Sequence, residues 1–231
     1  SLLGFSFYSL WNSGFFLVKN IQIVIFNEME QKDFFAPLRQ VLQNQLSDYA
    51  GKSIFDVPFD QIQKKLLKTK WIKSARLYRQ WPNQLQVEIQ SKELVFLLKS
   101  KHKEWIPVVA DGSMLDSVSS NSLPDIPIVN QEMFEKDLSL RTKLINVMQE
   151  IPKQGVFSRE NISDAGYDTQ DGFWVSMIAN ETKIKLGNDN YNLKSERLSQ
   201  VIEYLNHREL KARVIDANFN KKVLVRLRKD P

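Results

Sequence analysis

Residues 71–89 read WIKSARLYRQWPNQLQVEI, and this stretch decides how the N-terminal part of the chain folds. Apolar and polar residues alternate strictly through Leu85, Val87 and Ile89, which is typical of a strand with one buried face. Ala75 and Leu77 alternate with polar neighbours in the same way, and the chain-breaking Trp81-Pro82-Asn83 separates the two runs. Residues 71–89 are therefore predicted to form a β-hairpin.

Elements before this hairpin complete a small α+β unit. Alternation over residues 21–25 predicts a strand. Apolar residues at helical spacing predict one helix between Asp33 and Gly51 and a second helix after Pro58. The predicted order is strand, helix, helix, strand, strand over residues 18–93, a length typical of a small domain.

Residues 94–231 are predicted to form a second, mixed α/β domain with a mostly antiparallel sheet. Helices are expected over 133–151, which Pro152 ends, and along the apolar face of Leu198, Val201, Ile202 and Leu205. Residues 117–127 have the composition of a loop. Strands are expected at 94–98, 105–109, 173–178, 183–186, 213–219 and 222–228.

The composition is that of an ordinary globular chain, with 42% hydrophobic and 26% charged residues among 231. Because the chain has no cysteine, a disulfide scaffold, a thiol nucleophile and a cysteine-ligated metal are excluded. The net charge of +5 favours an acidic partner or surface.

Catalytic motifs are absent from the sequence. Gly51-Lys52-Ser53 is similar to the end of a phosphate-binding loop, but that motif needs a glycine where Leu46 stands. His102 and His207 lack motif partners and are interpreted as solvated side chains. No enzyme activity, cofactor or metal is therefore predicted.

Residues 1–17 are mostly apolar and aromatic, but serine, asparagine and glycine interrupt them. A membrane-spanning helix needs about 20 apolar residues, so this segment cannot cross a bilayer by itself. Two interpretations stay open from the residues alone. The segment is either the outer end of a transmembrane helix or a hydrophobic arm that packs on the domain.

Two basic runs are candidates for partner binding. The first has no acidic residue between Asp60 and Glu88 and contains Lys64, Lys65, Lys68, Lys70, Lys73, Arg76 and Arg79. The second lies at the C-terminus and contains Lys221, Lys222, Arg226, Arg228 and Lys229. The last strand, 222–228, alternates, so that Val223, Val225 and Leu227 are predicted to face the core of their domain and Lys222, Leu224, Arg226 and Arg228 the other side. This strand is expected at a sheet edge, where basic side chains discourage self-pairing and accept an acidic strand. A merely solvated face is the alternative for both runs. A nucleic-acid surface is a further alternative for the first, although stacking aromatics are not regularly interleaved with its basic residues.

The residues between Gly51 and Glu93 resemble the POTRA domain of the FtsQ/DivIB family of bacterial cell-division proteins. The resemblance is carried by residues 71–89, by Ser53-Ile54-Phe55 and by Leu66-Leu67-Lys68. It continues through Val109-Ala110-Asp111-Gly112, Leu123-Pro124, 174–178, 183–187, 195–205 and 214–219. Two places depart from the family pattern: Val95-Phe96, where a proline is usual, and Asn218-Phe219, where Arg-Tyr is usual.

The resemblance implies a non-enzymatic scaffold in the inner membrane at the division septum, with a single membrane pass and its domains in the periplasm or extracytoplasmic space. Residues 1–17 would be the membrane-proximal end of the anchor, 18–93 the POTRA domain and 94–231 the β domain. A POTRA-bearing outer-membrane assembly or secretion factor is the alternative, but such proteins carry several POTRA units or a long β-barrel.

The resemblance also implies FtsB and FtsL as partners, together with other division proteins. The FtsB-type site is expected in the C-terminal strands, at Asn218, Phe219, Lys222, Val223, Leu224, Val225, Arg226 and Arg228. A second contact is expected on the POTRA domain, at Lys68, Lys70, Lys73, Arg76 and Arg79.

Overall fold

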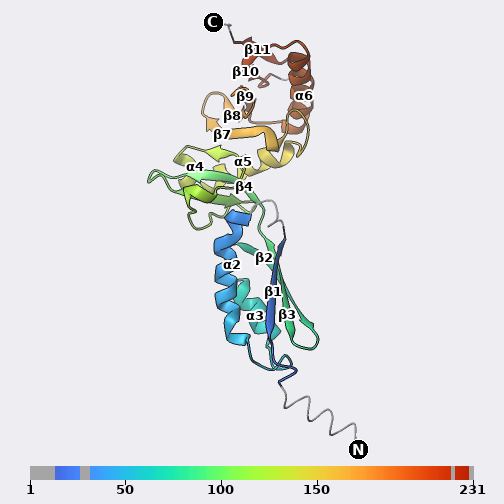
Figure 1. Ribbon diagram of the computed structural model, residues 1–231. Helices are drawn as coiled ribbons and strands as arrows, with labels where there is room; N and C mark the ends of the chain where they lie inside the picture. Colours follow the sequence, from blue (N-terminus) through green and yellow to red (C-terminus); the bar gives the residue numbers. More distant parts are fainter. Residues whose placement is uncertain (1–13, 27–31, 220–221, 229–231) are drawn as a thin grey trace, which may run out of the picture. The chain divides into compact units, whose positions relative to one another are not determined.

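The computed structural model describes residues 14–26, 32–219 and 222–228 (Figure 1). The chain divides into two compact units, Ser1–Lys92 and Glu93–Pro231. Each unit has its own sheet, so each is described by itself.

The first unit is a three-stranded sheet with two helices on one face (Figure 1). Its elements are β1 (Asn20–Phe26), α2 (Lys32–Leu46), α3 (Phe59–Leu66), β2 (Ile72–Gln80) and β3 (Gln84–Ser91). The strand order is β1-β3-β2, with β1 parallel and β2 antiparallel to the central β3. The predicted order of elements and the predicted hairpin are confirmed.

The alternation in residues 85–89 gives the central strand β3 one fully buried face. Leu85, Val87 and Ile89 are each 0% exposed. Full burial of such a side chain contributes roughly 1.5–3 kcal/mol. The two helices bury their own apolar faces in the same unit, through Phe34, Phe35, Leu38, Leu42, Leu46, Ile62 and Leu66.

The second unit is built on an eight-stranded sheet with the order β11-β10-β9-β8-β7-β6-β4-β5. The first half of its chain forms β4 (Leu94–Lys99), β5 (Trp105–Val109), β6 (Ile128–Val129), α4 (Met133–Lys136) and α5 (Leu138–Glu150). The second half forms β7 (Ile162–Asp168), β8 (Gly172–Met177), β9 (Lys183–Gly187), α6 (Tyr191–His207), β10 (Ala212–Asp216) and β11 (Leu224–Leu227). Four of the seven strand pairings are antiparallel, so the predicted α+β fold with a mostly antiparallel sheet is confirmed.

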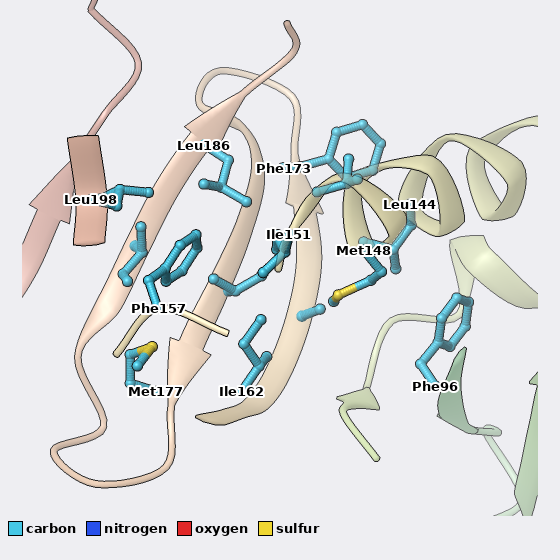
Figure 2. Close-up of a cluster of buried hydrophobic side chains, with 14 of the residues drawn as sticks. Phe96, Leu144, Met148, Ile151, Phe157, Ile162, Phe173, Met177, Leu186 and Leu198 are labelled. Atoms are coloured by element: carbon cyan, nitrogen blue, oxygen red, sulfur yellow. The ribbon is translucent and has the colours of Figure 1, made fainter. Parts of the chain in front are cut away.

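The core of the second unit lies between this sheet and its helices. Leu144 and Met148 of α5 and Leu198 of α6 are buried against it. Figure 2 shows Met148, Ile151, Phe157 and Ile162 gathered within one apolar cluster. The helices therefore hold the sheet through apolar packing.

Two strands of this sheet were not predicted, and the reason is local. β7 contains Asp164 and Gly166, residue types that strands disfavour. Gly166 lies opposite Trp174, and a Cβ atom on it would meet Trp174 Cζ2 at 2.5 Å. The contact with the indole thus requires glycine there. β6 has only two residues, too few for an alternation to be recognised.

The helix predicted over 133–151 is wrong in one respect, because it is broken at Asp137. This residue has an extended backbone with ψ 102°, and its carboxylate accepts a hydrogen bond from the amide of Leu140 at 3.0 Å. It therefore caps α5 and ends α4. The loop expected over 117–127 also contains one short 3-10 turn, Ser120–Ser122.

Hydrogen bonds from Arg141 stabilise the break between α4 and α5. Its side chain is buried and donates to the carbonyl oxygens of Phe134 at 2.7 Å, Glu135 at 2.9 Å and Gly112 at 3.1 Å. One guanidinium group thereby ties α5 to α4 and to the turn at Asp111-Gly112.

We expect Val87→Asp to lower the free energy of unfolding of the first unit by about 3 kcal/mol or more, because it buries an unpaired carboxylate in the central strand. Gln90→Asp is the matched control, since Gln90 is exposed on the opposite face of the same strand. Thermal unfolding compares the two variants. A Val87→Asp protein that melts within a couple of degrees of the wild type would contradict the strand register.

We expect Arg141→Met to cost about 2–4 kcal/mol of stability, because three carbonyl oxygens, two of them in buried hydrogen bonds, lose their donor. Lys143→Met, at an exposed position of the same helix, is expected to cost under about 0.5 kcal/mol. Chemical denaturation measures both. Equal midpoints for the two variants would show that these hydrogen bonds do not hold the helix break.

Candidate partner-binding site

β11 is the last strand of the eight-stranded sheet. It pairs antiparallel with β10, with Asp216 opposite Leu224, Ile215 opposite Val225 and Val214 opposite Arg226. Within the described ranges no strand pairs with its outer side. The opposite edge of the sheet differs, because β5 is bridged there by Val118 and Met114. The outer edge of β11 therefore presents backbone groups to which a further strand can bind.

Hydrogen bonds from the rest of the unit fix this edge in place. β10 lies parallel to β9, and the amide of Ala217 donates to the carbonyl oxygen of Lys185 at 2.9 Å. Thr182 Oγ1 donates to the carbonyl oxygen of Ala212 at 2.8 Å. Arg228 extends the pairing, since its amide donates to Lys211 and its guanidinium to the carbonyl oxygen of Asn180.

A buried lysine holds the end of β9 and the residues just after it. Lys194 is 3% exposed, and its Nζ lies 2.8 Å from both the Leu186 carbonyl oxygen and Asp189 Oδ1. A Cβ atom on Gly187 would collide with the side chain of Asn218 and approach Lys194 Nζ at 3.3 Å. Asn218 thus packs against the glycine that ends β9, where the family pattern has arginine.

Tyr191, the first residue of α6, contacts the same glycine, Gly187. Burial disfavours its phenolate and raises the pKa of Tyr191 to about 12. The hydroxyl, which is protonated at neutral pH, donates to the Gly187 carbonyl oxygen at 3.4 Å.

The side chains of β11 follow the predicted alternation only in part. Val223 and Val225 pack against the core, as predicted. Leu227 was expected beside them and is instead 48% exposed, so that prediction is wrong. Leu224 on the other face is 43% exposed, and Arg226 is exposed as well.

Leu227 is exposed because it lines an apolar groove between β11 and α6. The groove has a volume of about 400 Å³ and is lined by Gln200, Val201, Tyr204, Leu205, Leu210, Val225 and Leu227. Tyr204 at 58% and Leu210 at 40% are among its most exposed apolar residues. Sequence reasoning missed the groove because its residues come from separate elements, although Tyr204 and Leu210 flank the predicted apolar face of α6.

Basic and aromatic side chains border the same edge. Lys222 is exposed, and its Nζ lies 5.2 Å from the centre of the Phe219 ring. Phe219 itself is 43% exposed. Four of the seven residues of the predicted strand 213–219 lie in β10, which ends at Asp216, and Asn218 and Phe219 follow it in the connection to β11. The site residues expected from the sequence thus lie together along one edge, with the groove beside them.

The basic run of the first unit is less uniform. Lys68, Lys70, Lys73 and Arg76 are exposed around the turn before β2 and along that strand. Arg79 is engaged in the fold: its Nε donates to the Ile54 carbonyl oxygen at 2.7 Å, and its guanidinium lies 4.1 Å from the centre of the Phe59 ring. The structure therefore separates Arg79 from the exposed part of the run.

Other kinds of site are not built by the described residues. His102 and His207 are exposed, as predicted. In the described ranges, histidine, aspartate and glutamate form no group of three that is placed to hold a metal ion. No helix in that part of the chain is both long and apolar enough to cross a bilayer.

Comparisons with known proteins match both units. The family model for the FtsQ-type POTRA domain matches residues 38–91, and the model for the C-terminal domain of cell division protein FtsQ/DivIB matches residues 97–218. The second match covers β10 and Asn218, and it ends before β11.

Curated relatives carry the same description. The chain is 22% identical to the cell division protein FtsQ of Syntrophotalea carbinolica, over 94% of this chain and 76% of the relative. It is 24% identical to the FtsQ of Geobacter sp. strain M21, over 97% of this chain and 82% of the relative. It is 19% identical to the FtsQ of Geotalea daltonii, over 82% of this chain and 72% of the relative.

We expect hydrogen exchange of the unliganded protein to alternate along β11. Amides that point to β10 should be protected, and those on the outer side should exchange freely, because an edge strand pairs only one side of its backbone. β9, which has neighbours on both sides, is the internal control. Uniform protection along Leu224–Leu227 would show that the outer edge is already covered.

Proposed function

This chain belongs to the FtsQ/DivIB family of bacterial cell-division proteins, and on that basis we propose that it is a non-enzymatic scaffold of the divisome whose β11 edge recruits FtsB-type and FtsL-type proteins. The observation that carries the proposal is the open outer side of β11 beside an apolar groove. Such an edge binds an extended segment by adding it to the sheet.

Each part of the edge supports a different part of recognition. The backbone of Leu224–Leu227 would supply main-chain hydrogen bonds to the added strand. The groove under Leu227 would take an apolar side chain of the partner, and Phe219 and Leu224 offer further apolar contacts. Lys222 and Arg226 favour an acidic segment, and such rim charges mainly raise the association rate. The partner segment is thus extended, acidic and interrupted by apolar residues.

We further propose that the first unit is the POTRA domain and the second the β domain, both on the outer face of the cytoplasmic membrane, with residues 1–17 as the membrane-proximal part of an anchor. Residues 14–17 are the described part of that segment. The Phe16 carbonyl oxygen accepts a hydrogen bond from Ile54, and Leu17 pairs with Ser53. The domain therefore already holds the chain before Val18, its expected first residue.

We expect Lys222→Glu with Arg226→Glu to weaken binding of an FtsB ectodomain, and more so at low salt, because the charge reversal repels an acidic segment. Lys101→Glu with Lys153→Glu is the matched control, since both lysines are exposed and lie outside the edge. Calorimetry at two salt concentrations measures the affinities. Undiminished affinity of the β11 pair would move the acidic contact elsewhere.

We expect Leu224→Pro to weaken the same binding, because proline removes the first amide of β11 and so loosens the start of the strand to which the partner would add. Far-ultraviolet circular dichroism checks that this variant stays folded. Lys68→Glu with Lys73→Glu tests the exposed POTRA run in parallel. A folded Leu224→Pro protein with wild-type affinity, together with a loss in the POTRA variant, would transfer the site to the first unit.

A further inference from the structure

One end of the first unit carries an aromatic patch, made of the half-buried Phe16 and the exposed Phe15, Phe55 and Trp81, with the exposed Leu17 next to them in the chain. These residues come from the segment before β1, the loop between α2 and α3, and the tip of the β2–β3 hairpin. The rings of Phe16, Phe55 and Trp81 pack together. Their centroids are 4.9 Å apart for Phe55 and Trp81, 5.4 Å for Phe16 and Phe55, and 6.3 Å for Phe16 and Trp81. Three distant stretches of chain thus form one apolar surface.

This aromatic patch is exposed, although the backbone beneath it is firmly held. Trp81 is 57% exposed, and Phe15 and Leu17 are each 39% exposed. The Ile54 amide donates to the Phe16 carbonyl oxygen at 2.9 Å, and Val18 donates to Lys52 at 2.9 Å. Arg79 fixes the same loop through the Ile54 carbonyl oxygen at 2.7 Å. The fold therefore positions a contiguous apolar surface that its own core does not use, which is typical of an interaction site.

The sequence next to the aromatic patch indicates what covers it. The patch begins directly after residues 1–13, a stretch rich in leucine, phenylalanine, tyrosine and tryptophan. Lys19 and Lys52 are exposed beside it, and Lys52 Nζ lies 5.1 Å from the centre of the Tyr49 ring. Tryptophan and tyrosine are enriched at the level of lipid headgroups, and lysine also serves as an interfacial anchor residue. Asp56 is the exposed acidic neighbour of Phe55, so attraction to anionic lipid is weak and apolar contact dominates.

We propose that the aromatic patch inserts into the interfacial layer of a phospholipid membrane and holds the first unit against the bilayer. The proposal rests on the proposed function, in which the segment ahead of the patch attaches the chain to the membrane. Attachment through that segment alone would leave the first unit free to turn on its tether. Insertion of Trp81, Phe15 and Leu17 gives the unit a second attachment and one fixed face toward the lipid.

The test uses the full chain, whose lack of cysteine allows one fluorescent label at a time. An environment-sensitive nitrobenzoxadiazole label is placed at Gln80→Cys, next to Trp81, or at Lys73→Cys near the other end of β2. The two positions are roughly 23 Å apart along the strand. In phosphatidylcholine vesicles we expect the Gln80 label to shift to the blue and to be quenched by lipid that carries a nitroxide near its headgroup. The Lys73 label should respond to neither.

The aromatic side chains are tested by Phe15→Ser with Trp81→Gln in the Gln80-labelled chain. We expect this variant to float with vesicles and to lose the nitroxide quenching. The control, Val41→Ser with Leu67→Ser, removes two apolar side chains of similar exposure elsewhere on the unit. This variant should keep the nitroxide quenching. Circular dichroism confirms that both variants are folded.

Three results would overturn the proposal, and they separate it from the proposed function. A chain that floats with vesicles while its Gln80 label stays in water would refute insertion of the patch and leave membrane attachment standing. A chain that does not float would refute insertion of the patch, whereas the proposed recruitment through β11 is tested separately by the binding of an FtsB ectodomain. A Gln80 label that is already blue-shifted without vesicles and insensitive to the nitroxide would show that protein, either residues 1–13 or a second copy, covers the patch.

Discussion

A strand at the edge of a sheet carries backbone N–H and C=O groups that the sheet itself cannot satisfy. In the second unit, the two edge strands β5 and β11 differ in whether the chain pairs these groups. At β5 the chain covers the edge by returning through Met114 and Val118. At β11 the described chain adds nothing, and the strand is short, basic and bordered by a groove. This asymmetry is what makes β11 the candidate for a strand supplied by another protein.

Packing and hydrogen bonds in the rest of the unit hold the β11 edge and the groove in place. α6 packs Leu198, Ile202 and Leu205 on the sheet, so that its outer side forms one wall of the groove. Lys194, buried at the start of the same helix, donates to the Leu186 carbonyl oxygen near the end of β9, and Asn218 packs against Gly187 beside it. A partner strand would therefore meet a preorganised edge, which lowers the entropic cost of binding.

The sequence predicted those elements that can be recognised from the pattern of neighbouring residues alone. The hairpin 71–89 follows from strict alternation on both sides of a chain breaker, and β3 is buried as that pattern requires. β7 escaped prediction because Gly166 is selected by its contact with Trp174, a neighbour eight positions away along the chain. The exposure of Leu227 escaped it because the groove arises only when α6 and β11 meet. Alternation identifies the two faces of a strand, and it does not tell how far a helix covers one of them.

The most direct measurement of the central claim is a set of intermolecular nuclear Overhauser effects between this protein and an isotope-labelled FtsB ectodomain. If a partner strand adds to the sheet, backbone protons of Leu224–Leu227 will show a regular ladder of contacts to consecutive residues of the partner, and side-chain protons of Tyr204 and Leu227 will contact one of its apolar residues. A stable complex whose contacts leave β11 untouched would contradict the account.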